Sequence, residues 1–362
     1  MRKLSSIVRD NRLYVFLLIF IIGINIIATI GERIEKAQRE VTTTPEAVEV
    51  KKEAPPGKEP LLSEEEIKAR QEKLLALAKE KPILYFFLGM LNLLILFIIL
   101  VGMILDAYFL KRWAKKEKLD IEIVEKETPR WTIADIVRVT LIFLSGGYLF
   151  VILQSFAMKS FPLLYNENFR MVFNTAVINA VGISVILYFV IKKHGQSAKA
   201  LGLTLKGFSK SVFLGITGYV TIVPILLAIM IATFYITKFI RYQPPVQPIV
   251  EVFLKEKATS ILWLSTMFAA IFGPIAEEIF FRGFMYKAIR EKMGIFAAMM
   301  VTSAIFAFLH AHIVGFVPIM VLGLLLAYVY EKTGSLVSSM SVHIVHNVGM
   351  VLLVFIARGV GT

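Results

Sequence analysis

Two adjacent carboxylates in an apolar stretch are the residues of this sequence best suited to chemistry. Glu277 and Glu278 lie within residues 274–282, which read PIAEEIFFR. Glu278 and Arg282 are four residues apart, so on a helix they share a face and can form an ion pair. Glu277 is then left without a local partner, and such a carboxylate can act as a general base. Pro274 is expected to disrupt the helix one turn earlier and to free a backbone carbonyl.

Two histidine motifs follow in later apolar runs. His310 ends the run FAFLH, and His312 comes two residues later, so on a helix the two imidazoles point to different faces. Only one of them is expected to face the glutamates. His343 and Asn347 are four residues apart and share a face, and both can donate hydrogen bonds to a developing negative charge. Taken alone, each motif is also compatible with polar packing between membrane helices.

The apolar runs that carry these residues are long enough to cross a bilayer, which takes about 20 residues. Of the 362 residues 57% are hydrophobic, and the mean hydropathy is +0.72, both above the values of soluble domains. We therefore predict an all-α fold, a polytopic transmembrane helix bundle of about nine spans. The predicted spans are residues 13–30, 83–110, 133–158, 171–191, 212–236, 261–285, 295–310, 313–330 and 336–356.

The last four spans bring the polar groups to one depth. Glu277 and His310 each lie about 16 residues from the turn expected near residue 293, which is about 24 Å along the helix axis. Asn347 lies about 20 Å from the same side of the membrane, and His343 lies one helical turn closer to that side. Ionisable groups inside a bilayer are costly, so their convergence predicts a functional site.

The sequence divides into four parts. Residues 1–30 are interpreted as a membrane anchor, because their apolar stretch exceeds the roughly 7–15 residues of a signal peptide and no clear cleavage site follows. Residues 31–82 are interpreted as a charged, partly disordered linker with an amphipathic helix. Residues 83–260 are expected to form accessory transmembrane helices, and residues 261–356 the core that carries the polar motifs.

The charge distribution indicates a membrane partner. Net charge is +13, and the Lys and Arg residues cluster beside the apolar runs, where they set orientation and contact anionic lipid. We therefore expect the lipid bilayer, and no nucleic acid, as a partner. The basic loops place the N-terminus in the cytoplasm and suit a plasma (inner) membrane. The absence of cysteine excludes thiol nucleophiles and cysteine-ligated metals.

In this order on successive apolar helices, the motifs EExxxR, FxxxH and HxxxN resemble the signature of the type II CAAX prenyl endopeptidases. That group also includes bacterial proteins associated with bacteriocin processing and self-immunity. The resemblance, over residues 261–356, implies an intramembrane endopeptidase that hydrolyses a peptide bond of a membrane-tethered protein or peptide. The substrate would be a CAAX-type prenylated protein or an unprenylated peptide in maturation or immunity. Glu278 and Arg282 would be a supporting pair that fixes the helix.

The resemblance also implies catalytic roles. Glu277 would act as general base on a water that His310 helps to hold and polarise. His343 and Asn347 would stabilise the oxyanion of the tetrahedral intermediate.

The use of a metal stays open. The resemblance implies either a metalloprotease, with a divalent metal such as zinc bound by Glu277, His310 and His343, or a metal-free glutamate mechanism. The zincin pattern HExxH is absent, and the sequence does not choose between the two. Two other functions also stay open: a transporter or proton relay, which would use the same buried ionisable residues, and a catalytically silent membrane scaffold.

Overall fold

The chain folds entirely into helices wherever the structure describes it. The structure is a computed structural model that describes residues 11–42, 79–80, 82–117, 119, 121–242 and 247–361. These residues form eight helices long and apolar enough to cross a membrane, and a ninth, shorter apolar helix. They contain no strand. The prediction of an all-α polytopic bundle is confirmed, and the chain is a multi-pass integral membrane protein. The predicted disordered stretch and amphipathic helix lie largely outside the described residues.

The chain divides into two compact units, residues 1–97 and 98–362. The first unit contains α2 (Arg12–Thr42) and the first half of α4 (Pro82–Ala114). The apolar side chains of these helices are mostly exposed, as lipid-facing side chains would be. The division into four parts made from the sequence remains a prediction.

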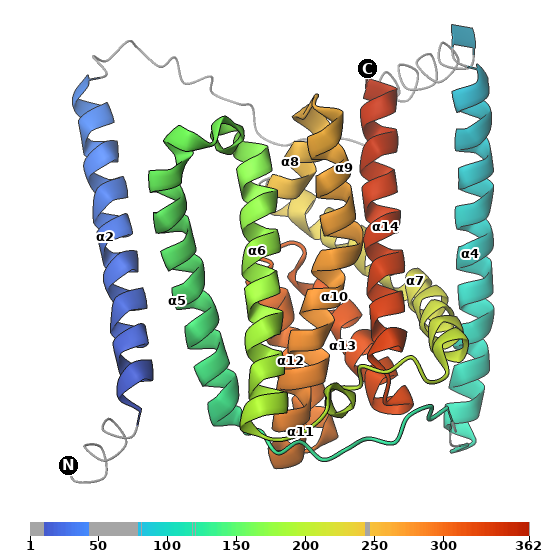
Figure 1. Cartoon of the computed structure of the whole chain (residues 1–362). Coiled ribbons are helices and arrows are strands. Elements are labelled where there is room, and N and C mark those ends of the chain that lie inside the picture. The colour runs from blue at the N-terminus through green and yellow to red at the C-terminus, as the bar shows by residue number, and fades with distance from the viewer. Residues whose placement is uncertain are drawn as a thin grey trace. The chain divides into compact units, whose positions relative to one another are not determined.

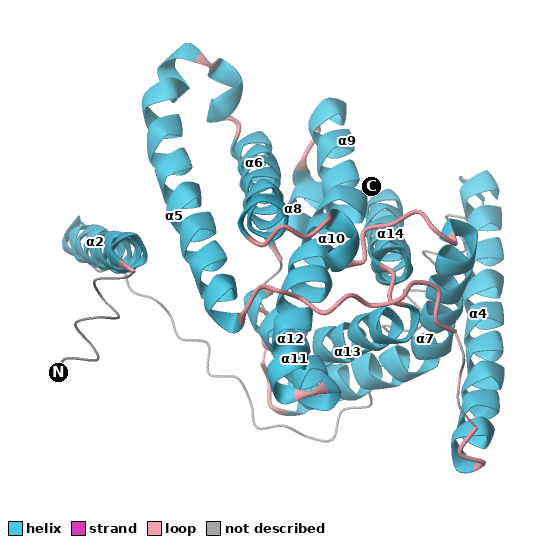
Figure 2. Cartoon of the chain, turned by 60° about the horizontal axis from the view of Figure 1, so that its bottom comes forward, coloured by secondary structure: helices cyan, strands magenta, loops and turns pink. Residues whose placement is uncertain are grey.

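The second unit contains the polar motifs. Its α-helices, shown in Figure 1, are α5 (Ile133–Ala157), α6 (Glu167–Leu187), α7 (Phe208–Phe239), α8 (Pro248–Lys255), α9 (Thr259–Met267), α10 (Gly273–Glu278), α11 (Lys287–Met293), α12 (Ile295–Leu309), α13 (Phe316–Thr333) and α14 (Leu336–Gly361). Short 3₁₀ turns, η1 (Met158–Ser160), η2 (Pro162–Tyr165) and η4 (Ala198–Leu201), join them, and the π-helical η3 (Tyr188–Lys193) extends α6. Viewed toward the helix ends in Figure 2, α13 lies beside both α12 and α7, and α14 packs on α7.

The span that contains the glutamates is a composite helix. Residues 259–293 run through α9, the π-helical segment η5 (Phe268–Phe272), α10, the π-helical segment η6 (Ile279–Tyr286) and α11 without a break. It is longer than the predicted span 261–285, because the helix continues through the polar residues of α11 to Gly294. Segments of π-helix are rare and concentrate at functional sites.

The chain just before the composite helix is held by Glu256. The carboxylate of Glu256 accepts hydrogen bonds from the backbone N–H groups of Lys257 and Ala258. Its Oε2 also accepts from Asn168 Nδ2 at 2.7 Å. The Asn168 hydrogen bond, with these backbone N–H groups, lowers the pKa of Glu256 below its ordinary value. The start of α9 is thereby tied to α6, which carries Asn168.

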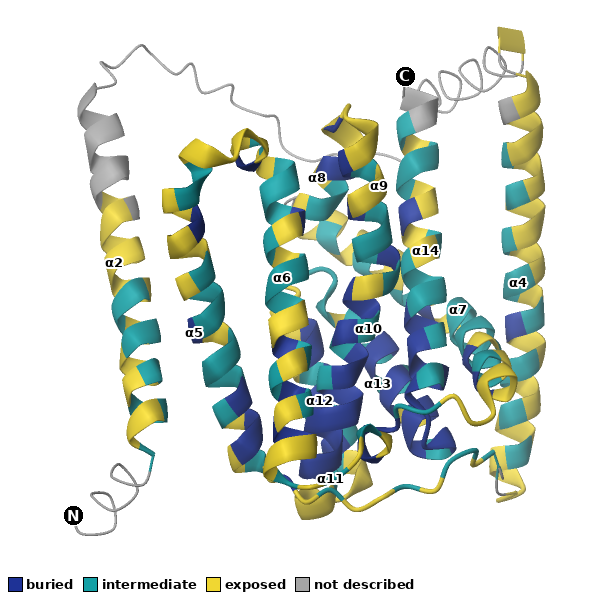
Figure 3. Ribbon diagram, in the orientation of Figure 1, coloured by how far each residue is buried: buried dark blue, intermediate teal, exposed yellow. Residues whose placement is uncertain are grey.

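The best-buried part of the second unit surrounds η6 and α11. Figure 3 shows buried residues gathered on α10, α11, α12 and α13, while much of α5 and α6 is exposed or intermediate. The largest fully buried side chains include Arg282, Tyr286, Tyr330 and Phe284. This core is the frame on which the polar motifs are mounted.

Helix α12 is too short to cross the bilayer. Its 15 residues extend about 22 Å, less than the roughly 30 Å of the hydrocarbon region. It begins after Gly294, whose φ of 82° suits a glycine at this reversal. His310 is the C-cap residue, so its imidazole is carried by the end of this short helix.

An extended segment, residues 121–131, crosses the ends of α11 and α13, and we refer to it as the strap. The backbone N–H groups of Ile123 and Val124 both donate to the Thr333 carbonyl at 3.0 Å. At its end, Trp131 stacks on Phe284 and donates from Nε1 to the Phe284 carbonyl at 2.9 Å. The strap is therefore fixed to the buried core at both ends.

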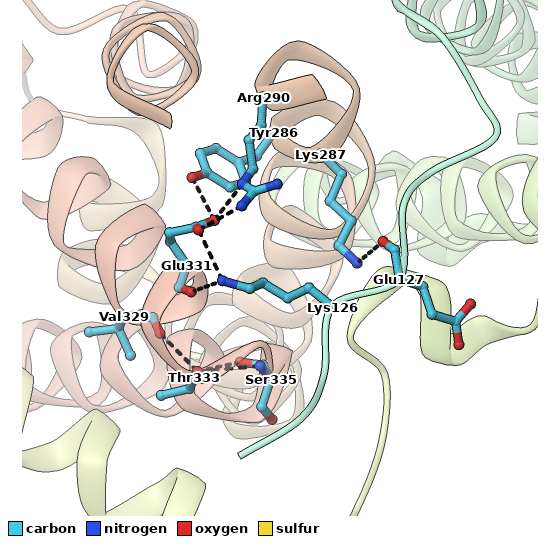
Figure 4. Close-up of polar contacts among 9 residues, drawn as sticks. All are labelled: Lys126, Glu127, Tyr286, Lys287, Arg290, Val329, Glu331, Thr333 and Ser335. Atoms are coloured by element: carbon cyan, nitrogen blue, oxygen red, sulfur yellow. Dashed lines mark hydrogen bonds and ion pairs between the residues drawn. The ribbon is translucent and has the colours of Figure 1, made fainter. Parts of the chain in front are cut away.

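Glu331, near the end of α13, joins the strap to η6 and α11 (Figure 4). Its carboxylate accepts from Lys126 Nζ at 2.9 Å, from Arg290 Nη2 at 3.0 Å and from the Tyr286 hydroxyl at 3.0 Å. The neighbouring Lys287, which is buried, donates to the Glu127 carbonyl of the strap at 3.2 Å. The Glu331 carboxylate thus accepts hydrogen bonds from two cationic side chains and one hydroxyl group.

Replacing Glu331 by Ala is expected to lower the free energy of unfolding by about 2 kcal/mol, because three donors lose a charged acceptor. The loss stays below that of a fully buried pair because Lys126 and Arg290 are partly exposed and can rehydrate. Thermal unfolding in detergent measures it. Glu291→Ala, an exposed residue of α11, is the matched control. Equal unfolding temperatures for the two variants would contradict the role of Glu331.

Candidate active site

The two adjacent glutamates occupy different environments. Both belong to α10, where successive side chains point about 100° apart around the axis. The Glu278 side chain is fully buried, whereas 35% of the Glu277 side chain is exposed. Glu277 is therefore the carboxylate that water or a substrate can reach.

Glu278 is held by two partners. Its Oε1 accepts from Arg282 Nη1 at 2.8 Å and pairs with His343 Nδ1 at 2.9 Å. The ion pair with Arg282 is the one expected from the four-residue spacing. The pair with His343 was not foreseen, because the two residues are 65 positions apart and helix spacing relates only residues of one helix.

Arg282 connects three helices. Besides Glu278, it donates from Nη2 to the Gly323 carbonyl on α13 at 3.2 Å, and its guanidinium lies 4.6 Å from the centre of the Phe306 ring on α12. Gly323 allows α13 to pack close to α12, since a Cβ at this position would lie 3.1 Å from the Cβ of Ser303 on α12. The buried arginine therefore depends on close contact between α12 and α13.

His343 links the buried carboxylate to the accessible one. An ionised Glu278 can only accept, so the proton of this hydrogen bond lies on Nδ1 of His343. The other nitrogen, Nε2, lies 3.7 Å from Oε2 of Glu277. Glu278 thus fixes the orientation of the imidazole with Nε2 toward Glu277, an arrangement in which the partner of one ring nitrogen defines the role of the other.

His310 joins this group through Phe306. Its Nδ1 lies 2.7 Å from the Phe306 carbonyl, and because a carbonyl only accepts, Nδ1 carries the proton and the Nε2 lone pair is left over. The Phe306 ring makes edge contacts with His310, at 4.7 Å between centroids, and with His343, at 5.6 Å. His312 instead accepts from the Gly315 N–H at 2.8 Å and closes the loop after α12.

Asn347 contacts the composite helix. Its Nδ2 donates to the Ala269 carbonyl in η5 at 2.8 Å. One N–H of the amide is therefore used by the protein, and the other remains for a further acceptor. The roles implied by the resemblance for Asn347 and the other site residues stay predictions.

The structure brings Glu277, Glu278, Arg282 and His343 into direct contact. The other two candidates lie close by, His310 through the Phe306 ring and Asn347 one turn along α14 from His343. Gly323 was not predicted from the sequence, and Phe306 was named only as part of the FxxxH motif, without a role. A signal for Phe306 was present, since it stands four residues before His310.

A metal centre at Glu277, His310 and His343 stays a prediction. Within the described part of the chain, no group of three or more His, Asp or Glu side chains is arranged to hold a metal ion. His343 has Nδ1 on Glu278, and its Nε2 is the nitrogen that faces Glu277. No catalytic step is therefore routed through a metal below.

Comparison with known families identifies the part of the chain that carries this constellation. Residues 259–349 match the family described as type II CAAX prenyl endopeptidase, Rce1-like. We refer to this segment, which is similar to that family, as the Rce1-like domain. The match contains all the site residues and begins at α9, so α2 to α8 lie outside it. The resemblance stated from the three motifs is confirmed for this segment.

The chain is also similar to a bacterial protein. Over 90 residues it is 30% identical to the "Putative membrane peptidase YdiL" of Bacillus subtilis (strain 168). That stretch is 25% of this chain and 37% of the relative, so the chain spans little more than a third of the protein it matches. No solved structure gives a significant match.

Proposed function

We propose that the chain is an intramembrane endopeptidase that hydrolyses a peptide bond of a membrane-tethered protein or peptide, with Glu277 as general base. The observation that carries the proposal is the pair of unequal carboxylates: a buried Glu278 that orients His343, and an accessible Glu277 that faces His343 Nε2 at 3.7 Å. The Rce1-like domain supports a membrane protease at family level.

In this mechanism a water bound to Glu277 attacks the carbonyl carbon of the scissile bond. Glu277 takes one proton from the water as the C–O bond forms, and later delivers it to the amine nitrogen as the C–N bond breaks. The products are a carboxylic acid and an amine, which balances the atoms of peptide and water. His310 supports the water by accepting a hydrogen bond at Nε2, the nitrogen left over by the Phe306 carbonyl.

His343 is assigned the oxyanion. To donate from Nε2 while Nδ1–H is bound to Glu278, the imidazole must be protonated on both nitrogens. The charges around it support this state: with an imidazolium, Glu277, Glu278, Arg282 and His343 sum to zero. Since net charge is costly in a bilayer, a neutral cluster is the favoured one. The second N–H of Asn347 is assigned to the same oxyanion.

The substrate is assigned from the setting of the site. A site within the bilayer can be reached by chains that are themselves tethered to the membrane, so we assign a lipidated C-terminus or a membrane-bound peptide. The basic loops assign the N-terminus to the cytoplasm and the protein to a plasma (inner) membrane. Purified protein offered prenylated and unprenylated versions of one peptide distinguishes CAAX-type processing from peptide maturation. If the protein hydrolysed neither of these peptides and no other membrane-tethered peptide, the proposal would be contradicted.

Hydrolysis is expected to survive removal of divalent metals by EDTA, because no group of three or more His, Asp or Glu side chains among the described residues is arranged to hold a metal ion. The measurement is peptide cleavage in detergent before and after chelation. A zinc-dependent protease in the same detergent is the control for the chelator. A loss of cleavage that added zinc restores would reinstate the metalloprotease mechanism.

A further inference from the structure

The backbone immediately before the glutamates is in an unusual register. The segment η5 is π-helical, and the N–H that follows it, that of Gly273, donates to the carbonyl five residues earlier, that of Phe268. The next residue is Pro274, which has no N–H. The carbonyl five residues before Pro274 is that of Ala269. In this register the proline leaves the Ala269 carbonyl without a backbone donor.

Asn347 supplies the missing donor. Its Nδ2 lies 2.8 Å from the Ala269 carbonyl oxygen, and because a carbonyl only accepts, the amide must present its nitrogen there. An unpaired carbonyl inside a bilayer is strongly unfavourable, so this contact replaces a required bond. The donor comes from α14, 78 residues later in the chain.

Helix α14 contacts the composite helix on both sides of Glu277. Asn347 binds Ala269, two turns before Glu277, and His343, one turn earlier on α14, binds Glu278, directly after it. The register between these two contacts determines where Glu277 points. A return of η5 to the α register would remove one residue from the turn and rotate Glu277 by about 100° relative to α9.

We propose that Asn347 is a positioning residue, which holds the carbonyl freed by Pro274 and thereby keeps the π register that aims Glu277 at His343. The effect of Asn347 on hydrolysis rests on the proposed function. Its contact with the Ala269 carbonyl does not depend on that function. This positioning role is separate from the oxyanion role, which uses the other N–H of the Asn347 amide and would not make η5 depend on Asn347.

The test is a rescue experiment. Asn347→Ala is expected to lower kcat about 100-fold with KM little changed, as small displacements of a reacting group do. It should also speed deuterium exchange of the η5 amides. In Asn347→Ala/Pro274→Ala the new N–H at position 274 can bond to the Ala269 carbonyl, so kcat should recover at least about tenfold. Ser341→Ala, on the same helix but bonded within it, is the matched control.

The outcomes distinguish a positioning role of Asn347 from an oxyanion role alone. Faster η5 exchange in Asn347→Ala supports the inference even if no peptide is hydrolysed, in which case only the proposed function fails. If Pro274→Ala alone loses activity while η5 exchange slows, the segment has returned to the α register, which also supports it. Unchanged η5 exchange in Asn347→Ala, together with no recovery in the double variant, would overturn it and leave Asn347 as an oxyanion donor.

Discussion

Replacing Glu277 by Gln is expected to lower kcat for peptide hydrolysis by about a thousandfold, within the range that loss of a general base produces. Glutamine has nearly the same shape as glutamate but cannot accept a proton from water. The unfolding temperature should hardly change, because the Glu277 side chain is partly exposed and its nearest ionic partner, His343 Nε2, is 3.7 Å away. Cleavage of a membrane-tethered peptide by purified protein measures the effect.

The matched control for this variant is Glu291→Gln, which makes the same chemical change at an exposed position on the same composite helix. It should cleave the peptide at the rate of the unaltered protein. If Glu277→Gln also kept that rate, the accessible carboxylate would not be the base, and another group would have to activate the water.

The spans could be predicted from the sequence because lipid imposes one rule on every helix. A run of about 20 apolar residues both crosses the hydrocarbon and satisfies its own backbone. The run 295–310 was also predicted as a span, but α12 (Ile295–Leu309) has only 15 residues and is too short to cross. That α12 stops short and caps itself with His310 depends on the turn that follows, where Ala311 adopts a positive φ of 49°.

Pairs within one helix could be predicted, and pairs between helices could not. Glu278 and Arg282 meet because they are four residues apart. The contact of Glu278 with His343 depends on how α10 and α14 are rotated against each other, which is a property of their packing. The same limit applies to Glu331, which is surrounded by donors from the strap and the composite helix.

The effect of Pro274 shows where the limit lies. Its lack of an N–H predicts a freed carbonyl from the sequence alone. Which carbonyl is freed depends on the register of η5, and a π register has no recurrent apolar spacing over so short a segment. The Ala269 carbonyl and its donor Asn347 could therefore be found only in the folded structure.

Replacing Glu278 alone by Leu is expected to destabilise the protein by about 3–5 kcal/mol, because it leaves the fully buried Arg282 without a counter-charge. Thermal unfolding in detergent measures this loss. The exposed pair of Glu251 and Lys255 on α8 has the same four-residue spacing and is the matched control. Glu251→Leu should have little effect, since exposed pairs contribute little to stability.

The double variant Glu278→Leu/Arg282→Met separates the two functions of Glu278. With both charges removed, no unpaired charge is left at these two positions. Most of the lost stability should therefore return, as it does for other buried pairs replaced by apolar residues. Hydrolysis should not return, because His343 Nδ1 has lost the acceptor that turns Nε2 toward Glu277. A stable double variant that cleaves the peptide at the original rate would reduce Glu278 to a counter-charge for Arg282, and the orientation of His343 would then need another cause.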